Sequence, residues 1–124
     1  MSFSLRLGQV FRPKAIQAHV HLILSSPSTP SSAVLVVNWT TLDEDCIDDA
    51  CVLYPGDHSV IRHPSAIAYS RARLWQAEKI MIAVKNGLLD ELESLTPAVL
   101  KRVVEGGIVS PELRPEWKAI LPKL

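Results

Sequence analysis

Apolar and polar residues alternate in one stretch near the N-terminus, and a fully apolar stretch follows after a polar loop. Within residues 19–24 (HVHLIL), Val20, Leu22 and Leu24 occupy alternate positions, the period of a half-buried strand. Residues 33–39 (AVLVVNW) are apolar and β-branched almost throughout, which is typical of a central strand covered on both faces. The segment between them, SSPSTPSS, contains no apolar residue. We therefore expect an antiparallel hairpin.

Three further stretches show weaker strand signals. Residues 4–7 with 10–11 predict a short first strand that ends at Arg12-Pro13, because proline cannot donate a ladder hydrogen bond. Residues 50–54 predict a strand stopped by the turn pair Pro55-Gly56. Residues 65–75 predict the last strand, and the acidic stretch 43–49 predicts a loop.

The remainder of the chain is predicted to be helical. Residues 77–86 have helical apolar spacing and end at Gly87, although residues 80–84 (IMIAV) also fit a strand. Thr96-Pro97 is a helix start, and that helix is expected to stop at the pair 106–107 (GG). Ser110-Pro111 precedes a final short helix around residues 115–121. The fold class is therefore α+β in a single domain, 1–124. It comprises a small SH3-like β-barrel or rolled antiparallel sheet over residues 1–76, then a helical part over residues 77–124 with two or three helices.

Charge is balanced over the chain but segregated along it. Thirteen Lys and Arg match thirteen Asp and Glu, which counts against a protein that coats DNA and permits self-association. Residues 43–57 carry six acids and no Lys or Arg, whereas residues 58–85 carry five bases and one acid. No apolar run is long enough to cross a membrane, and the first fifteen residues lack a signal peptide's apolar core. We expect a cytoplasmic protein.

Metal ligation is one interpretation of the reactive residues between positions 46 and 63. Cys46, Cys51, His58 and His63 are the four ligand types of a Cys2His2 zinc site, but only six residues separate the two pairs. The acids around Cys46 also disfavour its thiolate. The sequence favours one loop cysteine and one core cysteine, and a solvated acidic loop. We expect no metal and no cofactor.

Phosphate chemistry is the other interpretation. His58 and His63 flank Arg62 closely, and two histidines with an arginine supply a base, an acid and a charge stabiliser for RNA cleavage by its own 2′-hydroxyl. The alternative, which residue types alone favour, is that Asp57 caps its turn, the histidines are polar loop residues and Arg62 pairs with the acidic loop.

Two other groups of residues are open to functional and structural interpretations. His19 and His21 share a strand face, which suits either a metal with a third ligand or, as we favour, a solvent-facing edge. Trp39, Trp75 and Trp117 lie far apart in the sequence, so core or interface packing is favoured over a base-stacking platform.

The hairpin resembles that of PemK/MazF-like toxins. The resemblance covers residues 5–85 and rests on residues 21–26 (HLILSS) and 34–41 (VLVVNWTT), in which Ser25 and Thr40 match the ends of the family's two strand patterns. Residues 51–63 (CVLYPGDHSVIRH) resemble a segment of one branch of the family. Those toxins are small SH3-like barrels with a C-terminal helix, and many are sequence-selective endoribonucleases of toxin–antitoxin pairs. The family's arginine–proline pair on the first strand is replaced here by residues 19–21 (HVH).

The resemblance implies a toxin-like protein of a toxin–antitoxin or mobile-element system, with metal-independent endoribonuclease activity. His58 and His63 would be the acid–base pair, Arg62 the phosphate stabiliser and Thr40 a positioning hydroxyl. A basic face would receive the RNA, formed by Arg71, Arg73 and Lys79. The expected partners are RNA, an antitoxin or other protein, and a second copy of the chain. The alternatives are a non-catalytic barrel that binds a protein through its C-terminal helices, and an inactive accessory protein of a mobile element.

Overall fold

The computed structural model describes residues 5–15, 19–26, 32–42 and 48–124, in which seven strands and three helices surround two apolar cores. In chain order the elements are β1 (Val10–Pro13), β2 (His21–Ile23), β3 (Ala33–Thr41), β4 (Val52–Leu53), β5 (Ser65–Ile67), the short 3-10 helix η1 (Tyr69–Arg71), β6 (Arg73–Gln76), α1 (Ala77–Lys85), β7 (Leu89–Leu92), α2 (Pro97–Val109) and α3 (Pro115–Lys118). The fold is α+β, as the sequence predicts.

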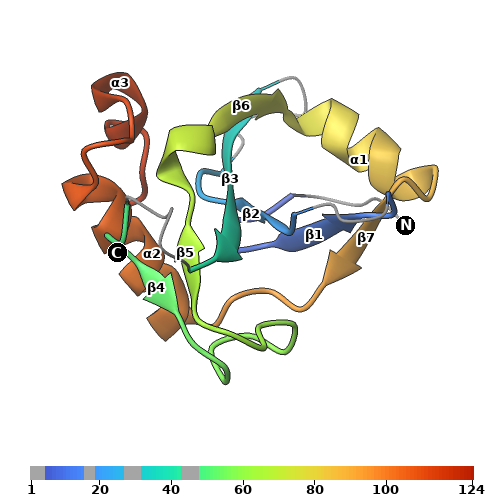
Figure 1. Ribbon diagram of the computed structural model, residues 1–124. Helices are drawn as coiled ribbons and strands as arrows, with labels where there is room; N and C mark the ends of the chain where they lie inside the picture. The colour runs from blue at the N-terminus through green and yellow to red at the C-terminus, as the bar shows by residue number, and fades with distance from the viewer. Residues whose placement is uncertain (1–4, 16–18, 27–31, 43–47) are drawn as a thin grey trace.

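The sheet is antiparallel throughout and is organised around β3, the long strand at the centre of Figure 1. Its strand order is β4-β5-β3-β2-β1-β7, with β6 paired to β3 outside this path. The first half of β3 pairs with β6 and the last three residues pair with β5. The predicted hairpin is confirmed, since β2 pairs with β3 in the register Leu22↔Val37.

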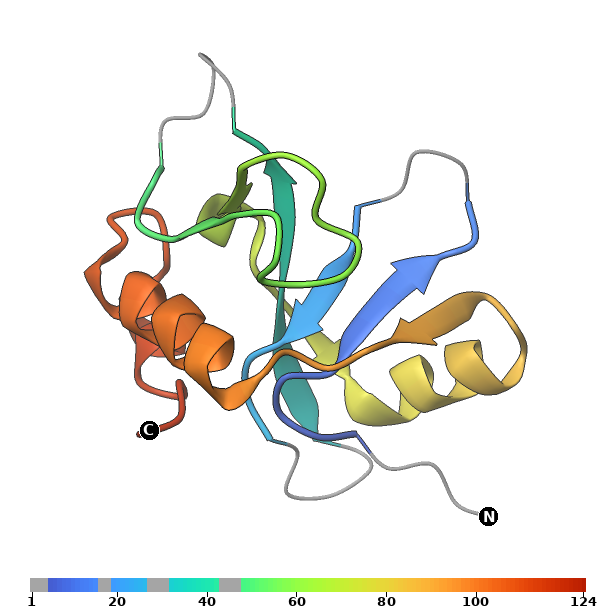
Figure 2. The same cartoon turned by 90° about the horizontal axis from the view of Figure 1, so that it is seen from below.

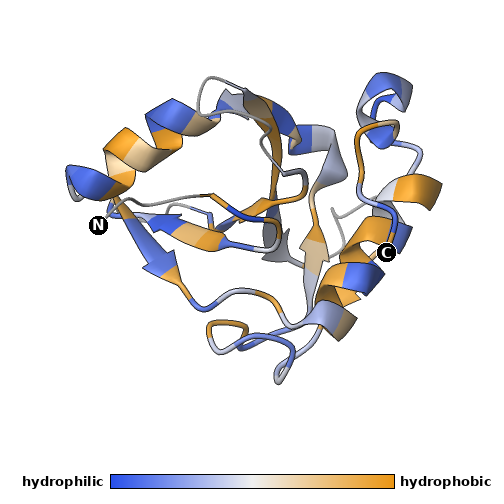
Figure 3. Cartoon of the chain, turned by 180° about the vertical axis from the view of Figure 1, so that it is seen from behind, coloured by the Kyte–Doolittle hydropathy of each residue, from blue (hydrophilic) through white to orange (hydrophobic). Residues whose placement is uncertain are grey.

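Helices cover both faces of the sheet. Leu35 and Val37 of β3 belong to the larger core, which α2 joins through Val103. The alternate residues Val34 and Val36 belong to a smaller core that contains Ile80 of α1. Because successive strand side chains point to opposite faces, the apolar run predicted to be central is buried on both sides. In Figure 3 the middle of the sheet and much of α2 are apolar.

Helix α1 confirms the helical interpretation of residues 77–86. It ends at Lys85, and Gly87 follows with a φ of +76°, a conformation that glycine adopts without steric penalty. Thr96 likewise caps α2 as predicted, its hydroxyl accepting a hydrogen bond from the Val99 amide at 3.3 Å.

Two predictions for the residues beyond 76 are wrong. The segment 77–124 is not purely helical, because Leu89–Leu92 forms β7 and pairs with β1 along Val10–Pro13. This four-residue strand has little signal of its own and forms because the unpaired edge of β1 accepts it. Helix α2 also continues through Gly106 and Gly107 to Val109, so the glycine pair does not end it.

The shorter strands also differ in extent from the sequence prediction. β1 begins only at Val10 and includes Arg12-Pro13, and β4 is limited to Val52–Leu53. The predicted strand over residues 65–75 is divided by η1 into β5 and β6. This break allows both pieces to pair with different halves of the same long strand, β3.

Candidate functional site

His58 is a buried histidine whose two ring nitrogens are both occupied. Its side chain is 1% exposed, and its ring centroid lies 5.5 Å from that of Trp39. Nε2 lies 2.7 Å from the Glu93 carbonyl oxygen, while Nδ1 accepts a hydrogen bond from the Val60 amide at 3.2 Å. These contacts place the proton of a neutral ring on Nε2. The ring therefore ties two loops together and has no nitrogen left for a substrate.

Three of the four predicted catalytic residues line one pocket of about 290 Å³, which we name the Arg62 pocket. It lies among the start of β2, the end of β3 and the loop before β5, which lie near one another in Figure 2. Its walls include Thr40, Arg62 and His63, together with His19, whereas His58 is not among them. Among the described residues, none of the lining side chains is acidic. The pocket thus brings an arginine, two histidines and a hydroxyl to one place.

His19 is held in this wall by Arg71 of η1. The Arg71 Nη1 atom lies 3.2 Å from His19 Nε2. A guanidinium only donates hydrogen bonds, so His19 accepts through an unprotonated Nε2. Arg71 therefore places a positive charge next to His19, which lines the pocket.

Arg62 and His63 are exposed, and within the described residues neither side chain forms an ion pair. The predicted pairing of Arg62 with the acidic loop falls mostly on residues 43–47, which lie outside the described residues. The Ser65 hydroxyl donates to the His63 carbonyl oxygen at 2.9 Å, which fixes the backbone that presents both side chains. Both side chains therefore lie at the surface of the part of the chain that the structure describes.

Asp57 is a structural residue, as one sequence interpretation held. One carboxylate oxygen accepts from the Tyr54 amide at 2.7 Å, and the other pairs with Arg102 of α2 at 2.9 Å. Partial burial acts to raise the pKa of Asp57, but the Tyr54 amide and Arg102 outweigh it and hold the pKa below its usual value. Arg102 also donates to the Val52 carbonyl oxygen at 2.8 Å. The turn before the Arg62 pocket is thereby anchored to α2.

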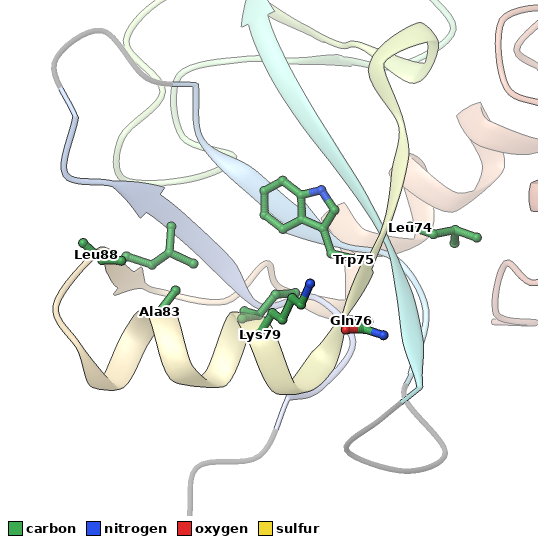
Figure 4. A pocket seen from close by; sticks show the side chains of 8 residues that line it. Leu74, Trp75, Gln76, Lys79, Ala83 and Leu88 are labelled. Atoms are coloured by element: carbon green, nitrogen blue, oxygen red, sulfur yellow. The ribbon is translucent and has the colours of Figure 1, made fainter.

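The three predicted RNA-binding residues follow η1, β6 and α1 rather than forming one compact patch. Arg71 lies behind the Arg62 pocket and Arg73 lies on β6. Lys79 lines a second, mainly apolar groove of about 440 Å³ between α1, β6 and the start of β7 (Figure 4). We name it the Trp75 groove.

The proposed zinc ligands do not form a site that the structure describes. Cys46 lies outside the described residues, and Cys51 is buried, with its Cβ facing Gly106 of α2. Burial raises the pKa of the Cys51 thiol, which disfavours the thiolate that metals require. Across the described parts of the chain, no three His, Cys, Asp or Glu side chains lie close enough to share a metal.

His19 and Arg102 lie at or near the candidate site, although the sequence placed neither in it: His19 was considered only as a metal ligand with His21 or as part of a solvent-facing edge, and Arg102 was not considered. His19 reaches the pocket because the start of β2 lies beside the end of β3, a consequence of the hairpin register. Arg102 meets Asp57 across 45 residues of sequence, and no local pattern marks such a contact. The hairpin prediction, which places residues 19–24 beside residues 33–39, was the signal that could have brought His19 to this pocket.

Comparison with known proteins gives no assignment. No family model matches the chain, and no curated protein or solved structure matches it. No helix in the described ranges has the length and apolar character needed to cross a bilayer.

Proposed function

We propose that this protein is a cytoplasmic RNA-cleaving toxin of the PemK/MazF-like kind that uses the Arg62 pocket without a metal. The observation that supports this proposal is the meeting of Thr40 with the adjacent pair Arg62 and His63 in one pocket, which has no acidic lining side chain among the described residues. An arginine in such a setting suits a phosphodiester, since its planar fork donates to two phosphate oxygens at once.

The proposed reaction is attack of a ribose 2′-oxygen on the adjacent phosphorus. His63 takes the 2′-hydroxyl proton, the new bond forms at phosphorus, and the bond to the 5′-oxygen breaks as that oxygen gains a proton from water. The products are a 2′,3′-cyclic phosphate and a free 5′-hydroxyl. Arg62 stabilises the charge on the phosphate oxygens, and the Thr40 hydroxyl positions the ribose. His58, predicted as a catalytic partner, instead supports the loop that carries Arg62 and His63.

The test is cleavage of labelled single-stranded RNA by the purified protein in the presence of a chelator. Arg62→Ala should slow cleavage about 10²- to 10³-fold and His63→Ala about 10²- to 10⁴-fold. Arg114→Ala, a change in an exposed arginine of α3's N-cap, is the control and should cleave normally. Cleavage of an all-deoxy oligonucleotide, or equal rates in all variants, would refute the mechanism.

A matching test in cells follows induced expression. The wild type should arrest growth with degraded RNA, whereas Arg62→Ala should permit growth. An antitoxin, if co-expressed, should restore growth by binding the toxin. We also propose a homodimer, which sedimentation of the purified chain tests directly.

The second candidate, a non-catalytic barrel that binds a protein through its C-terminal helices, is favoured by one observation. Ile108 and Val109 at the end of α2 are 55% and 69% exposed, so two adjacent apolar side chains face outward there. Deleting the helices would unfold the protein because α2 supplies much of the larger core. Val109→Asp is therefore the useful variant. Intact RNA and normal growth with the wild-type protein, together with loss of partner binding in Val109→Asp, would favour the second candidate.

A further inference from the structure

The Trp75 groove is a second concave surface that the proposed cleavage does not use. Trp75 forms one side, and Lys79 and Ala83 of α1 lie across from it, with Leu88 at one end (Figure 4). Trp75 is half-buried, whereas Leu88 is 64% exposed. The volume of the Trp75 groove, about 440 Å³, falls within the range of small-ligand sites.

Ring contacts connect this groove to the Arg62 pocket. The Trp75 indole lies 4.9 Å from the imidazole of His21, with the two planes inclined by 50°. His21 is two residues from His19, which lines the Arg62 pocket. Burial lowers the pKa of His21, and the neighbouring His19 lowers it further, so near neutral pH the ring beside Trp75 is uncharged. His21 therefore lies between Trp75 of the groove and His19 of the Arg62 pocket along the chain that enters β2.

Basic side chains lie on β6, which pairs with β3, and on the elements at either end of β6. Arg73 and Trp75 pair with Val36 and Val34 of β3, and alternate residues of a strand project from the same face. Arg73 thus lies on the Trp75 side of β6, between Arg71 at the first pocket and Lys79 at the groove. Within the described residues, neither Arg73 nor Lys79 forms an ion pair.

We propose that the Trp75 groove binds a nucleobase of single-stranded RNA, stacked on the Trp75 indole, while Lys79 and Arg73 bind the adjoining phosphates. The inference rests on the proposed RNA-cleaving function, to which it adds the site for a nucleotide next to the one being cleaved. An aromatic side chain can stack on any base, and the positive charges of Lys79 and Arg73 complement the negative charge of the RNA backbone. The amide of Gln76 at the rim supplies a donor and an acceptor for the base edge.

Removing the stacking side chain and removing a positive charge should have different effects on RNA binding. Loss of one stacked base weakens binding about 5- to 150-fold, so Trp75→Leu should fall in that range. Lys79→Gln should lower the slope of log affinity against log salt by about 0.7, the value for one phosphate contact on a single strand. Lys85→Gln is the matched control, because Lys85 lies on the same helix but does not line the groove.

The experiment measures tryptophan fluorescence and affinity with single-stranded RNA oligonucleotides of about 4 to 16 nucleotides. A second probe is an abasic oligonucleotide of equal length, which keeps the phosphates and removes the bases. Trp39 also lines the Arg62 pocket, so the signal of Trp75 is the difference between the wild type and Trp75→Phe. RNA should quench the wild type more than Trp75→Phe, and the abasic probe should quench the two proteins equally. Leu88→Glu changes an exposed side chain, so it keeps the fold and should weaken RNA binding even if a Trp75 variant fails to fold.

The outcomes separate this inference from the proposed function. RNA cleavage that depends on Arg62, with equal quenching of the wild type and Trp75→Phe and with normal affinity in Leu88→Glu, would overturn the nucleobase site and leave the cleavage proposal intact. Quenching of Trp75 that requires bases, with no cleavage, would support the site and overturn the catalytic proposal. Quenching of Trp75 by the abasic probe as strong as that by the RNA would overturn stacking on Trp75.

Discussion

Replacing Gly106 with alanine should destabilise the fold even though alanine is the better helix former. A Cβ at this position of α2 would lie 2.5 Å from the Tyr69 hydroxyl oxygen and 2.7 Å from Cys51 Cβ. Neither neighbour is the free end of a flexible chain. The Tyr69 hydroxyl donates to the Val103 carbonyl oxygen at 2.6 Å, and Cys51 Cβ is attached directly to buried backbone. The helix must therefore move away from the sheet.

The magnitude follows from three contributions. Overpacking a closed core position costs about 1–3 kcal/mol. Displacement of Tyr69 loses a buried hydrogen bond worth about 1 kcal/mol. The gain in helix propensity returns about 1 kcal/mol. We expect Gly106→Ala to lower the free energy of unfolding by about 1–3 kcal/mol.

Urea denaturation followed by circular dichroism measures this change, and the next residue provides the control. A Cβ on Gly107 would meet Leu121 Cδ1 at 3.1 Å and Tyr69 Cε1 at 3.3 Å, distances that small side-chain shifts relieve. Gly107→Ala gains the same propensity and should stay within about 1 kcal/mol of the wild type. If Gly106→Ala is as stable as Gly107→Ala, the close packing of α2 on Tyr69 is wrong.

Three other predictions concern residues that hold or surround the site. His58→Ala leaves the Glu93 carbonyl and the Val60 amide without their partner and should destabilise by about 2–4 kcal/mol in urea denaturation; a catalytic defect without loss of stability would contradict the structural role. Arg102→Ala breaks the contacts to Asp57 and the Val52 carbonyl and should cost about 1 kcal/mol because the pair is partly exposed, whereas no change in the urea midpoint would show that the anchor is dispensable. Burial lowers the pKa of His21 in the folded protein, so as the pH drops the unfolded chain binds this proton first. Stability should therefore fall as the pH drops from about 7 toward the lowered pKa. The stability of His21→Phe should fall less over the same range, and parallel stability–pH curves for variant and wild type would refute this.

The parts of the fold that were predicted correctly have strong local signals. Residues 33–39 are a buried central strand because a β-branched apolar run can satisfy both faces of a sheet. Thr96 with Pro97 begins α2 because the hydroxyl and the fixed proline φ both suit a helix start. Each of these signals acts within a few residues, so neighbouring sequence is sufficient to show it.

The predictions that failed depend on contacts across the chain. Gly106 is not a helix end, because its missing side chain admits Tyr69 and Cys51 against α2. β7 exists because β1 offers it an edge. Of the four residues named as catalytic from the sequence, Thr40, Arg62 and His63 line one pocket, whereas the His58 ring is held away from it by Glu93, which lies 35 residues away.

The sequence by itself determined the α+β class, the central hairpin, the starts of α1 and α2 and the segment that contains His58, Arg62 and His63. Periodicity and capping are local, and they need no knowledge of the partner elements. Only the tertiary structure decided which of those side chains face a ligand, because burial depends on what packs over each residue. His58 Nε2 is occupied by the distant Glu93 carbonyl and Nδ1 by the nearby Val60 amide, His19 gained a place in the pocket through the hairpin register, and Trp75 came to form the wall of a groove because α1 and β7 close around it.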